Sequence, residues 1–326
     1  MTQLQSYPGG SKGRVSRAGD RVSLGVASDE DLTIIDTWRA AHKAVLNTFQ
    51  AVLRSRTRAT EVVVAQRHKR KNTIFNKLKR IPGMQLARMD DIAGCRLIFP
   101  GISELNKFRD RFLTAKFDHK QRNDPEKYNY ISCPKSSGYR GIHDIYEYDV
   151  RSSEGSHLKG LLIEIQYRTR IQHAWATTVE VIGYITSSQP KFQTGDDRYH
   201  KIMALASEIC ARAHEDLNGP FPELSDADVC DEFVRMDREL NLIRTLKGLN
   251  QAKANAEDRK NVILVFGTLG ELEMFSFRDS NMALQRLFEI EKSSPGKDVV
   301  LVRAESNEDV RFAYKNYFSD ATEFIT

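Results

Sequence analysis

The chain has 326 residues, and its 49 lysines and arginines outnumber its 44 aspartates and glutamates, so the formal net charge is +5. This length allows one large domain or two modest ones with a buried core. The sequence contains no run of about 18 apolar residues, so we expect no membrane span. The N-terminus lacks the apolar segment of a secretory signal. The four cysteines show no CxxC spacing, so we expect free buried thiols in a cytoplasmic protein.

The positive charge is concentrated in the first two thirds of the chain. Residues 1–220 hold 35 lysines and arginines against 24 acids, residues 221–258 hold 5 against 9, and residues 259–326 hold 9 against 11. A basic region of this kind suits polyanionic ligands such as nucleotides or RNA. A solubilising surface would explain a smaller excess equally well.

The first elements predict alternating helices and strands. Residues 1–28 are rich in glycine, serine and arginine, and we expect a flexible tail. Asp29–Arg58 carries an apolar stripe at helical spacing, Glu61–Ala65 is a strand candidate, and Lys71–Arg80 is a short basic helix. Cys95–Phe99 is typical of a buried strand. The alternation predicts an α/β (α+β) fold with a mixed sheet flanked by helices.

The stretch Leu161–Tyr184 carries the strongest local pattern. Its first residues alternate, so that Glu164, Gln166 and Arg168 share one face of a predicted strand. From Thr169, an N-cap candidate, the apolar residues recur at helical spacing. An acid, an amide and an arginine side by side indicate either a solvated strand face or a functional site.

The last third of the chain predicts a second unit. Residues 221–258 read as a charged helical connector and residues 259–326 as a small α/β domain. The predicted elements of that domain are strands Val262–Phe266, Leu272–Phe277 and Val299–Arg303, helices Asn281–Glu291 and Glu308–Tyr317, and a hairpin turn at Gly267–Gly270. Since it contains no histidine, no cysteine and no phosphate-binding glycine loop, we expect a regulatory or interaction domain, or else a packing extension.

Four ordered segments resemble the synthetase domain of the RelA/SpoT family of alarmone synthetases, especially its small and toxic single-domain members. They are RHKRKNTIFNK (Arg67–Lys77), DDIAGCRLIF (Asp90–Phe99), KSSGYRGIH (Lys135–His143) and EIQYRT (Glu164–Thr169), the last followed by a helix with Trp-Ala-Thr. The resemblance covers roughly residues 60–185. It implies a nucleotidyltransferase-like pyrophosphokinase domain over residues 29–220.

The first two segments are implied to bind the donor, ATP. The matching positions are Arg67, Lys69, Thr73, Lys77 and Arg96. Thr73 stands where the family usually has serine, and the two arginines are implied to sandwich the adenine, which a guanidinium plane does better than a lysine. Asp91 is implied to hold Mg²⁺. Without the resemblance, a solvated basic helix and a helix-capping aspartate would explain the same residues.

The other two segments are implied to bind the acceptor and to carry out catalysis. Tyr139 is implied to stack on the acceptor base, with Lys135, Arg140 and His143 near its phosphates. Gly141 follows Tyr139-Arg140, at a position where the family usually has serine or another residue with a side chain. Glu164 is implied to act as general base and second Mg²⁺ ligand, supported by Gln166 and Arg168.

The resemblance therefore implies a Mg²⁺-dependent pyrophosphokinase that makes (p)ppGpp-type alarmones from ATP and GDP or GTP. One alternative is a toxin that pyrophosphorylates the 3′ end of tRNA and blocks translation, which suits the basic residues 1–220. A second is an inactive nucleotide- or RNA-binding module, although Asp91 and Glu164 are both present. A protein regulator or antitoxin is a possible partner, and neither DNA nor a membrane is expected. Because no histidine-rich pattern precedes the four segments, we expect no hydrolase domain and no transition metal.

Overall fold

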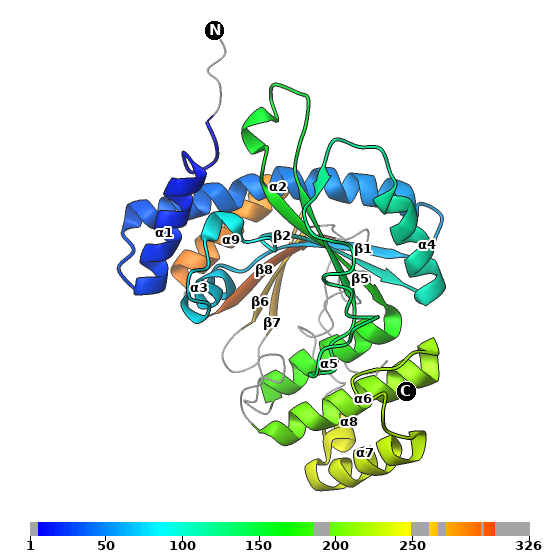
Figure 1. Cartoon of the computed structure of the whole chain (residues 1–326). Coiled ribbons are helices and arrows are strands. Elements are labelled where there is room, and N and C mark those ends of the chain that lie inside the picture. Colours follow the sequence, from blue (N-terminus) through cyan, green and yellow to red (C-terminus); the bar gives the residue numbers. More distant parts are fainter. Residues whose placement is uncertain (1–5, 186–195, 249–260, 267–271, 295–296, 304–326) are drawn as a thin grey trace.

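The computed structural model describes residues 6–185, 196–248, 261–266, 272–294 and 297–303 (Figure 1). Within them, eight strands form one mixed sheet in the order β3-β4-β5-β2-β1-β8-β6-β7. The strands are β1 Val63–His68, β2 Ala93–Phe99, β3 Lys120–Gln121, β4 Ile142–Glu147, β5 Leu162–Thr169, β6 Asn261–Phe266, β7 Leu272–Phe277 and β8 Asp298–Arg303. Strands β2 and β5 are parallel, and the other named pairs are antiparallel.

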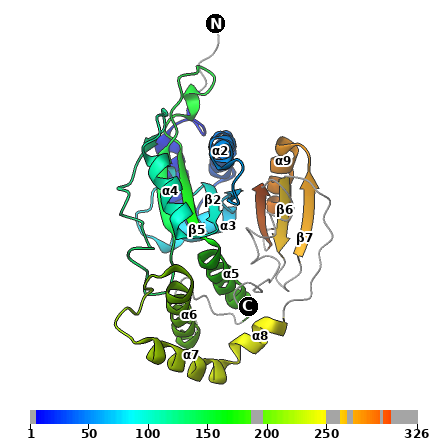
Figure 2. The ribbon, with the colours of Figure 1, turned by 90° about the vertical axis from the view of Figure 1, so that its right-hand side faces the viewer.

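Helices flank this sheet, which confirms the expected α/β class. The described helices are α1 Lys12–Leu24, α2 Asp29–Thr57, α3 Lys71–Arg80, α4 Ile102–Leu113, α5 Arg170–Ile185, α6 Asp197–Glu215, α7 Asp226–Leu240, α8 Leu242–Gly248 and α9 Ser280–Ser293. Helix α7 packs on α6, and α8 packs on α7, away from the sheet (Figure 2). Figure 2 shows α2 end-on, with β5 and β2 on one side and β6 and α9 on the other. None of the described helices is long and apolar enough to span a membrane.

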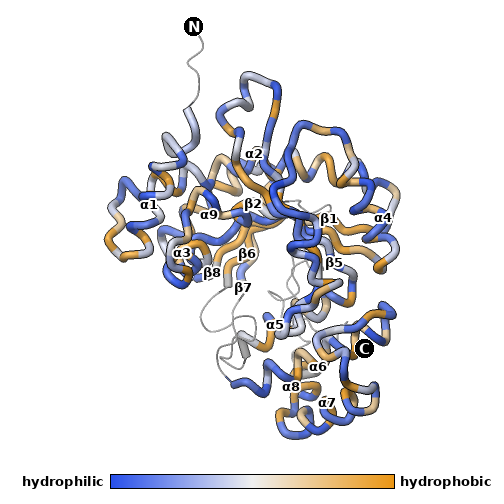
Figure 3. The backbone as a smooth tube through the Cα atoms, in the orientation of Figure 1, coloured by the Kyte–Doolittle hydropathy of each residue, from blue (hydrophilic) through white to orange (hydrophobic). Residues whose placement is uncertain are grey.

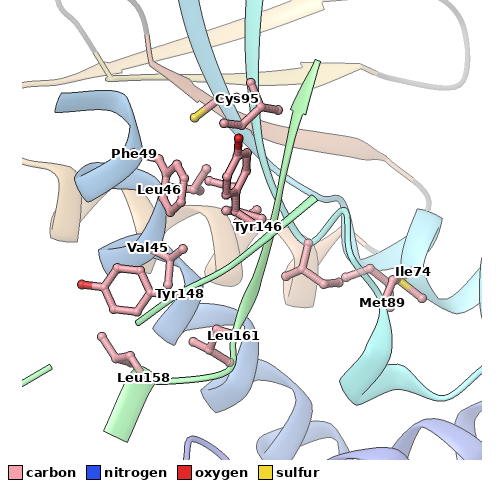
Figure 4. Close-up of a cluster of buried hydrophobic side chains, with 14 of the residues drawn as sticks. Val45, Leu46, Phe49, Ile74, Met89, Cys95, Tyr146, Tyr148, Leu158 and Leu161 are labelled. Carbon is pink, nitrogen blue, oxygen red and sulfur yellow. The ribbon is translucent and has the colours of Figure 1, made fainter. Parts of the chain in front are cut away.

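Helix α2 covers the apolar face of the central strands. Its start is fixed by a capping box between Ser28 and Asp31, and its buried stripe includes Val45, Leu46 and Phe49. Figure 4 shows this stripe against side chains from β2 and β4 and from the segment leading into β5, and the tube in Figure 3 shows apolar residues gathered along these strands. Because one face of the strands is committed to this core, their alternate residues are presented on the other face.

The N-terminal segment contains a helix where a flexible tail was expected. Helix α1 starts at Ser11, whose side chain accepts a hydrogen bond from the backbone of Arg14, and ends at Gly25 with φ at 75°. It packs on α2 and α3 through a buried stripe that includes Val15 and Val22. The expectation is wrong here because the buried residues Val15, Ala18 and Val22 recur at helical spacing and outweigh the glycine and serine content.

The C-terminal strands continue the same sheet. Strand β8 pairs with β1 at Gln66↔Arg303 and Arg67↔Val302, and β6 and β7 follow outward from it. The predicted strands and the helix now called α9 are confirmed at the expected positions. The predicted turn Gly267–Gly270, the helix Glu308–Tyr317 and residues 249–258 of the connector lie outside the described residues. The division into separate domains stays a prediction.

Candidate active site

One face of the central sheet gathers the polar side chains of the motif segments. Since residues paired across strands point to the same side, the register places the following residues on the face opposite α2: Arg67 on β1, Gly94 and Arg96 on β2, His143 on β4, and Glu164, Gln166 and Arg168 on β5. Arg67, Gly94 and Glu164 lie in one rung across three strands. A Cβ on Gly94 would lie 3.9 Å from Arg67 Cγ, which is an ordinary van der Waals contact, so the side chain of Arg67 passes close to the backbone of Gly94.

Two lysines converge on Asp91 beside this face. Lys69, just after β1, donates to Asp91 Oδ2, and Lys77 Nζ on α3 lies 3.2 Å from Asp91 Oδ1. Burial lowers the pKa of Lys69. Burial opposes ionisation of Asp91, but Lys69 and Lys77 hold the pKa of Asp91 below its ordinary value. Thr73 lies in the first turn of α3, between the two lysines in sequence. The junction of β1 and α3 thus presents cations around one carboxylate, an arrangement suited to phosphates and a divalent cation.

Glu164 is held by two neighbours. Its Oε1 lies 2.8 Å from His143 Nδ1, and its Oε2 accepts a hydrogen bond from Gln166 Nε2 at 2.6 Å. Gln166 in turn accepts from Arg96 Nε at 3.3 Å. Burial opposes the charge on Glu164, but His143 and Gln166 hold the pKa of this carboxyl well below its ordinary value. Glu164 is therefore an oriented carboxylate at neutral pH.

The imidazole of His143 should titrate at high pH because it faces Glu164. Burial opposes its charge, yet Tyr139 and Glu164 raise the pKa of His143 from 6.5 to about 9. The ion pair between His143 and Glu164 stabilises the fold fully between pH 4.5, the ordinary pKa of glutamate, and pH 6.5, the ordinary pKa of histidine. This stabilisation is lost as the pH rises through about 9, the pKa of His143 in the fold. We expect an NMR titration of His143 with a midpoint near 9 that moves toward 6.5 in Glu164→Gln.

His119 provides the control in the same spectrum. It stacks on Phe49 of α2 and so lies on the other face of the sheet. Its titration should be the same in both proteins, and an unchanged His143 midpoint in Glu164→Gln would contradict the pairing.

The loop before β4 supplies aromatic rings at the Arg168 end of the site. The hydroxyl of Tyr139 lies 2.5 Å from His143 Nε2 and accepts from Arg168 Nη2 at 3.0 Å. Burial opposes ionisation, but Arg168 and His143 lower the pKa of Tyr139 to about 7. Gly138 allows the turn: its φ is +88°, and a Cβ there would lie 2.8 Å from Trp175 Cζ2.

Tyr130 is a site residue that the motif comparison missed. Its ring centroid lies 5.8 Å from that of Tyr139, and Lys135 Nζ lies 4.1 Å from the Tyr130 centroid. The signal in the sequence was the pair Tyr128 and Tyr130, aromatic at alternate positions just before the third motif segment. The two rings and the lysine form a surface suited to a base carrying phosphates.

The guanidinium of Arg140 points to helix α6 and not to the other predicted acceptor residues. Its guanidinium donates to Glu215 and, at 3.1 Å through Nε, to Ser207, both on α6. Only 2% of the side chain of either ion-pair partner is exposed. Glu215 also accepts from Thr169 and Gln172. Arg140 therefore links α6 to the segment that leads into β4.

Replacing Arg140 with methionine should destabilise the fold. The buried carboxylate of Glu215 would lose its cationic partner, a change that typically costs about 3–5 kcal/mol. The free energy of unfolding in urea should fall by that order. The matched control is Arg151→Met, because Arg151 pairs with Asp118 on the surface and 89% of its side chain is exposed. Equal urea midpoints for the two variants would contradict the structural role of Arg140.

The carboxylates of the site fit Mg²⁺. Asp90, Asp91 and Glu164 lie close enough for burial and their mutual repulsion to raise the pKa of Asp90. In the described parts of the chain, no group of three or more His, Cys, Asp or Glu is arranged to hold a metal ion by itself. Mg²⁺ is usually held by one or two carboxylates together with substrate phosphates and water. Asp91 and Glu164 are the donors that such a site would use.

Comparisons with known proteins agree with the motif positions. Residues 66–187 match a family model described as "Region found in RelA / SpoT proteins". The GTP pyrophosphokinase YjbM of Bacillus subtilis is 27% identical over 157 residues, which is 48% of this chain and 69% of YjbM. The uncharacterized protein Rv1366 of Mycobacterium tuberculosis is 28% identical over 183 residues, which is 56% of this chain and 62% of Rv1366.

Solved structures also match the chain. The small alarmone synthetase 1 of Bacillus subtilis, bound to its product pppGpp, aligns with a TM-score of 0.46 and 24% identity over 54% of this chain and 90% of that chain. A GTP pyrophosphokinase family protein from Streptococcus pneumoniae aligns with a TM-score of 0.42 and 23% identity, over 65% of this chain and 96% of that chain.

Proposed function

Since residues 66–187 belong to the RelA/SpoT family, we propose that this protein transfers the β,γ-pyrophosphate of ATP to the 3′-hydroxyl of a guanine nucleotide. The products would be AMP and a (p)ppGpp-type alarmone. The observation that carries the proposal is a pair of carboxylates among cations: Glu164 shares a sheet face with Arg67, and Asp91 lies beside that face in contact with Lys69 and Lys77. Pyrophosphoryl transfer needs such a combination of cations, a metal site and a base.

The donor site makes use of the residues around Asp91. The triphosphate would draw Lys69 and Lys77 away from Asp91, which frees this carboxylate for a metal ion. Mg²⁺, bound by Asp91 and Glu164, would supply neutralisation of the charge on the transferred group. Arg67 and Arg96, from neighbouring strands, would lie against the adenine.

The transfer step uses Glu164 as the proton acceptor. The 3′-oxygen of the acceptor forms a bond to the β-phosphorus, the bond from that phosphorus to the α,β-bridging oxygen breaks, and AMP leaves. The proton of the hydroxyl passes to the Glu164 carboxylate. His143 and Gln166 hold the two carboxylate oxygens in place, so this group needs little reorganisation during the reaction.

We propose that the acceptor binds at the end of the face that carries Tyr130 and Tyr139. Tyr139 and Tyr130 offer rings for stacking on the base, and Lys135 lies over the Tyr130 ring. Because the Tyr139 hydroxyl contacts His143, which contacts Glu164, the acceptor-binding ring is linked to the base.

The 3′ end of tRNA is the second candidate acceptor. The excess of basic residues in 1–220 favours a polyanion of this size. The test incubates the protein with Mg²⁺, ATP labelled in the γ-phosphate and, separately, GDP, GTP or deacylated tRNA. We expect label in the guanine nucleotides, and label in tRNA alone would replace the alarmone assignment with the tRNA-directed one.

A further inference from the structure

Helix α3, which carries donor-site residues, is capped by a residue from the far end of the chain. Arg70, at its N-cap position, makes no side-chain capping hydrogen bond. Instead, Glu291 Oε1, near the end of α9, accepts a hydrogen bond from the backbone N–H of Lys71 at 3.2 Å. A carboxylate at a helix N-terminus satisfies an unbonded N–H group and interacts favourably with the helix dipole. Glu291 thus does for α3 what an N-cap side chain usually does.

The carboxylate of Glu291 is fixed by a buried arginine. Arg39 of α2 reaches it with two bonds, Nη1 to Oε2 at 2.9 Å and Nη2 to Oε1 at 3.2 Å. The side chain of Arg39 is 0% exposed, and that of Glu291 is 9% exposed. The same Nη2 donates to the backbone oxygen of Lys69 at 3.0 Å, and Phe288 of α9 lies 5.1 Å from the guanidinium carbon. Two-point pairing of this kind fixes both position and orientation.

These contacts meet at the segment that holds the donor residues. Lys69 lies between the end of β1 and α3, and Lys77 lies on α3 itself. Strand β8 contacts the same segment through its pairing with Arg67. Glu291 in the last turn of α9 reaches the first residue of α3, Lys71. The C-terminal unit (residues 259–326) therefore contacts the segment from Arg67 to Lys77 at Arg67, through β8, and at Lys71, through Glu291.

We propose that Glu291 is a positioning residue for the ATP site and that the C-terminal unit sets donor affinity through it. This proposal rests on the proposed pyrophosphokinase function. Loss of the Glu291 carboxylate would release the first turn of α3 and the backbone of Lys69. The donor site would lose its preset geometry, while the acceptor rings Tyr130 and Tyr139, on the loop before β4, would be unaffected.

The experiment compares full-length Glu291→Ala and Glu291→Gln with the wild type. For each we measure KM for ATP, KM for the acceptor, kcat, and Kd for a non-hydrolysable ATP analogue. For Glu291→Ala, KM for ATP and analogue Kd should rise roughly five- to tenfold, the scale of a lost helix cap. Acceptor KM and kcat should stay within about twofold. Glu291→Gln keeps an acceptor oxygen for Lys71 but loses the charge, so its effect should be intermediate.

The matched control is Glu289→Ala. Glu289 lies two residues earlier on α9, 62% of its side chain is exposed, and it pairs with Arg286 on the same helix. It should leave every constant at the wild-type value.

Two results would overturn the proposal. The first is a Glu291→Ala protein with wild-type KM and Kd for the donor. The second is an equal rise in donor and acceptor KM, together with a lower unfolding temperature, in both Glu291 variants. If the wild type binds the analogue but transfers nothing, the proposed function fails and the analogue Kd still decides the role of Glu291. If the wild type does not bind the analogue, both fail.

Discussion

Glu164→Gln is expected to lower the rate of pyrophosphate transfer by roughly 10²–10⁴-fold, the usual contribution of general acid–base catalysis. The amide cannot accept the hydroxyl proton and is a poor ligand for Mg²⁺. It keeps the size of the side chain, which lies among His143 and Gln166. The measurement is the rate of AMP release in the presence of saturating ATP and acceptor.

The control is Glu154→Gln, a change of the same kind in an exposed turn. It should leave the rate at the wild-type value. Circular dichroism should show the same fold for both variants. A Glu164→Gln protein that transfers pyrophosphate as fast as Glu154→Gln would exclude Glu164 as the base.

Asp91→Asn should have the second largest effect, lowering the rate roughly 10²–10³-fold and raising the Mg²⁺ concentration needed for half-maximal activity. The substitution removes the proposed metal ligand and leaves Lys69 and Lys77 without the carboxylate that they share. The measurement is a titration of transfer activity with Mg²⁺ at saturating ATP.

Asp90→Asn is the matched control for Asp91. Asp90 is the preceding residue, but its Oδ1 lies 3.9 Å from Lys77 Nζ, and 34% of its side chain is exposed. We expect a loss of roughly tenfold or less, without a change in the Mg²⁺ requirement. The opposite order of the two variants would transfer the metal-binding role to Asp90.

The sequence predicted the central strand and its polar face because their physical signal is local. A strand with one face in the core must alternate, so Glu164, Gln166 and Arg168 had to share the other face. The sequence did not predict that Arg67 and Glu164 lie on either side of Gly94. Their alignment depends on the register of three strands from distant parts of the chain.

Long-range partners account for what the sequence did not reveal. Arg140 lies in a motif segment, but its role is decided by Glu215, 75 residues later. Glu291 caps a helix 220 residues earlier in the chain, and no periodicity in either helix indicates that contact. Helix α1 was missed for a different reason, because its glycine and serine content was given more weight than the apolar stripe that includes Val15 and Val22.

The most direct test of the account identifies the products formed from ATP labelled in the β-phosphate. With Mg²⁺ and a guanine nucleotide, the protein should release unlabelled AMP and form one acceptor carrying a labelled diphosphate for each AMP, and chelation of Mg²⁺ should stop both. Release of labelled ADP with a singly phosphorylated acceptor would show an ordinary phosphoryl transfer. That result, or no AMP with any acceptor, would contradict pyrophosphate transfer at Asp91 and Glu164.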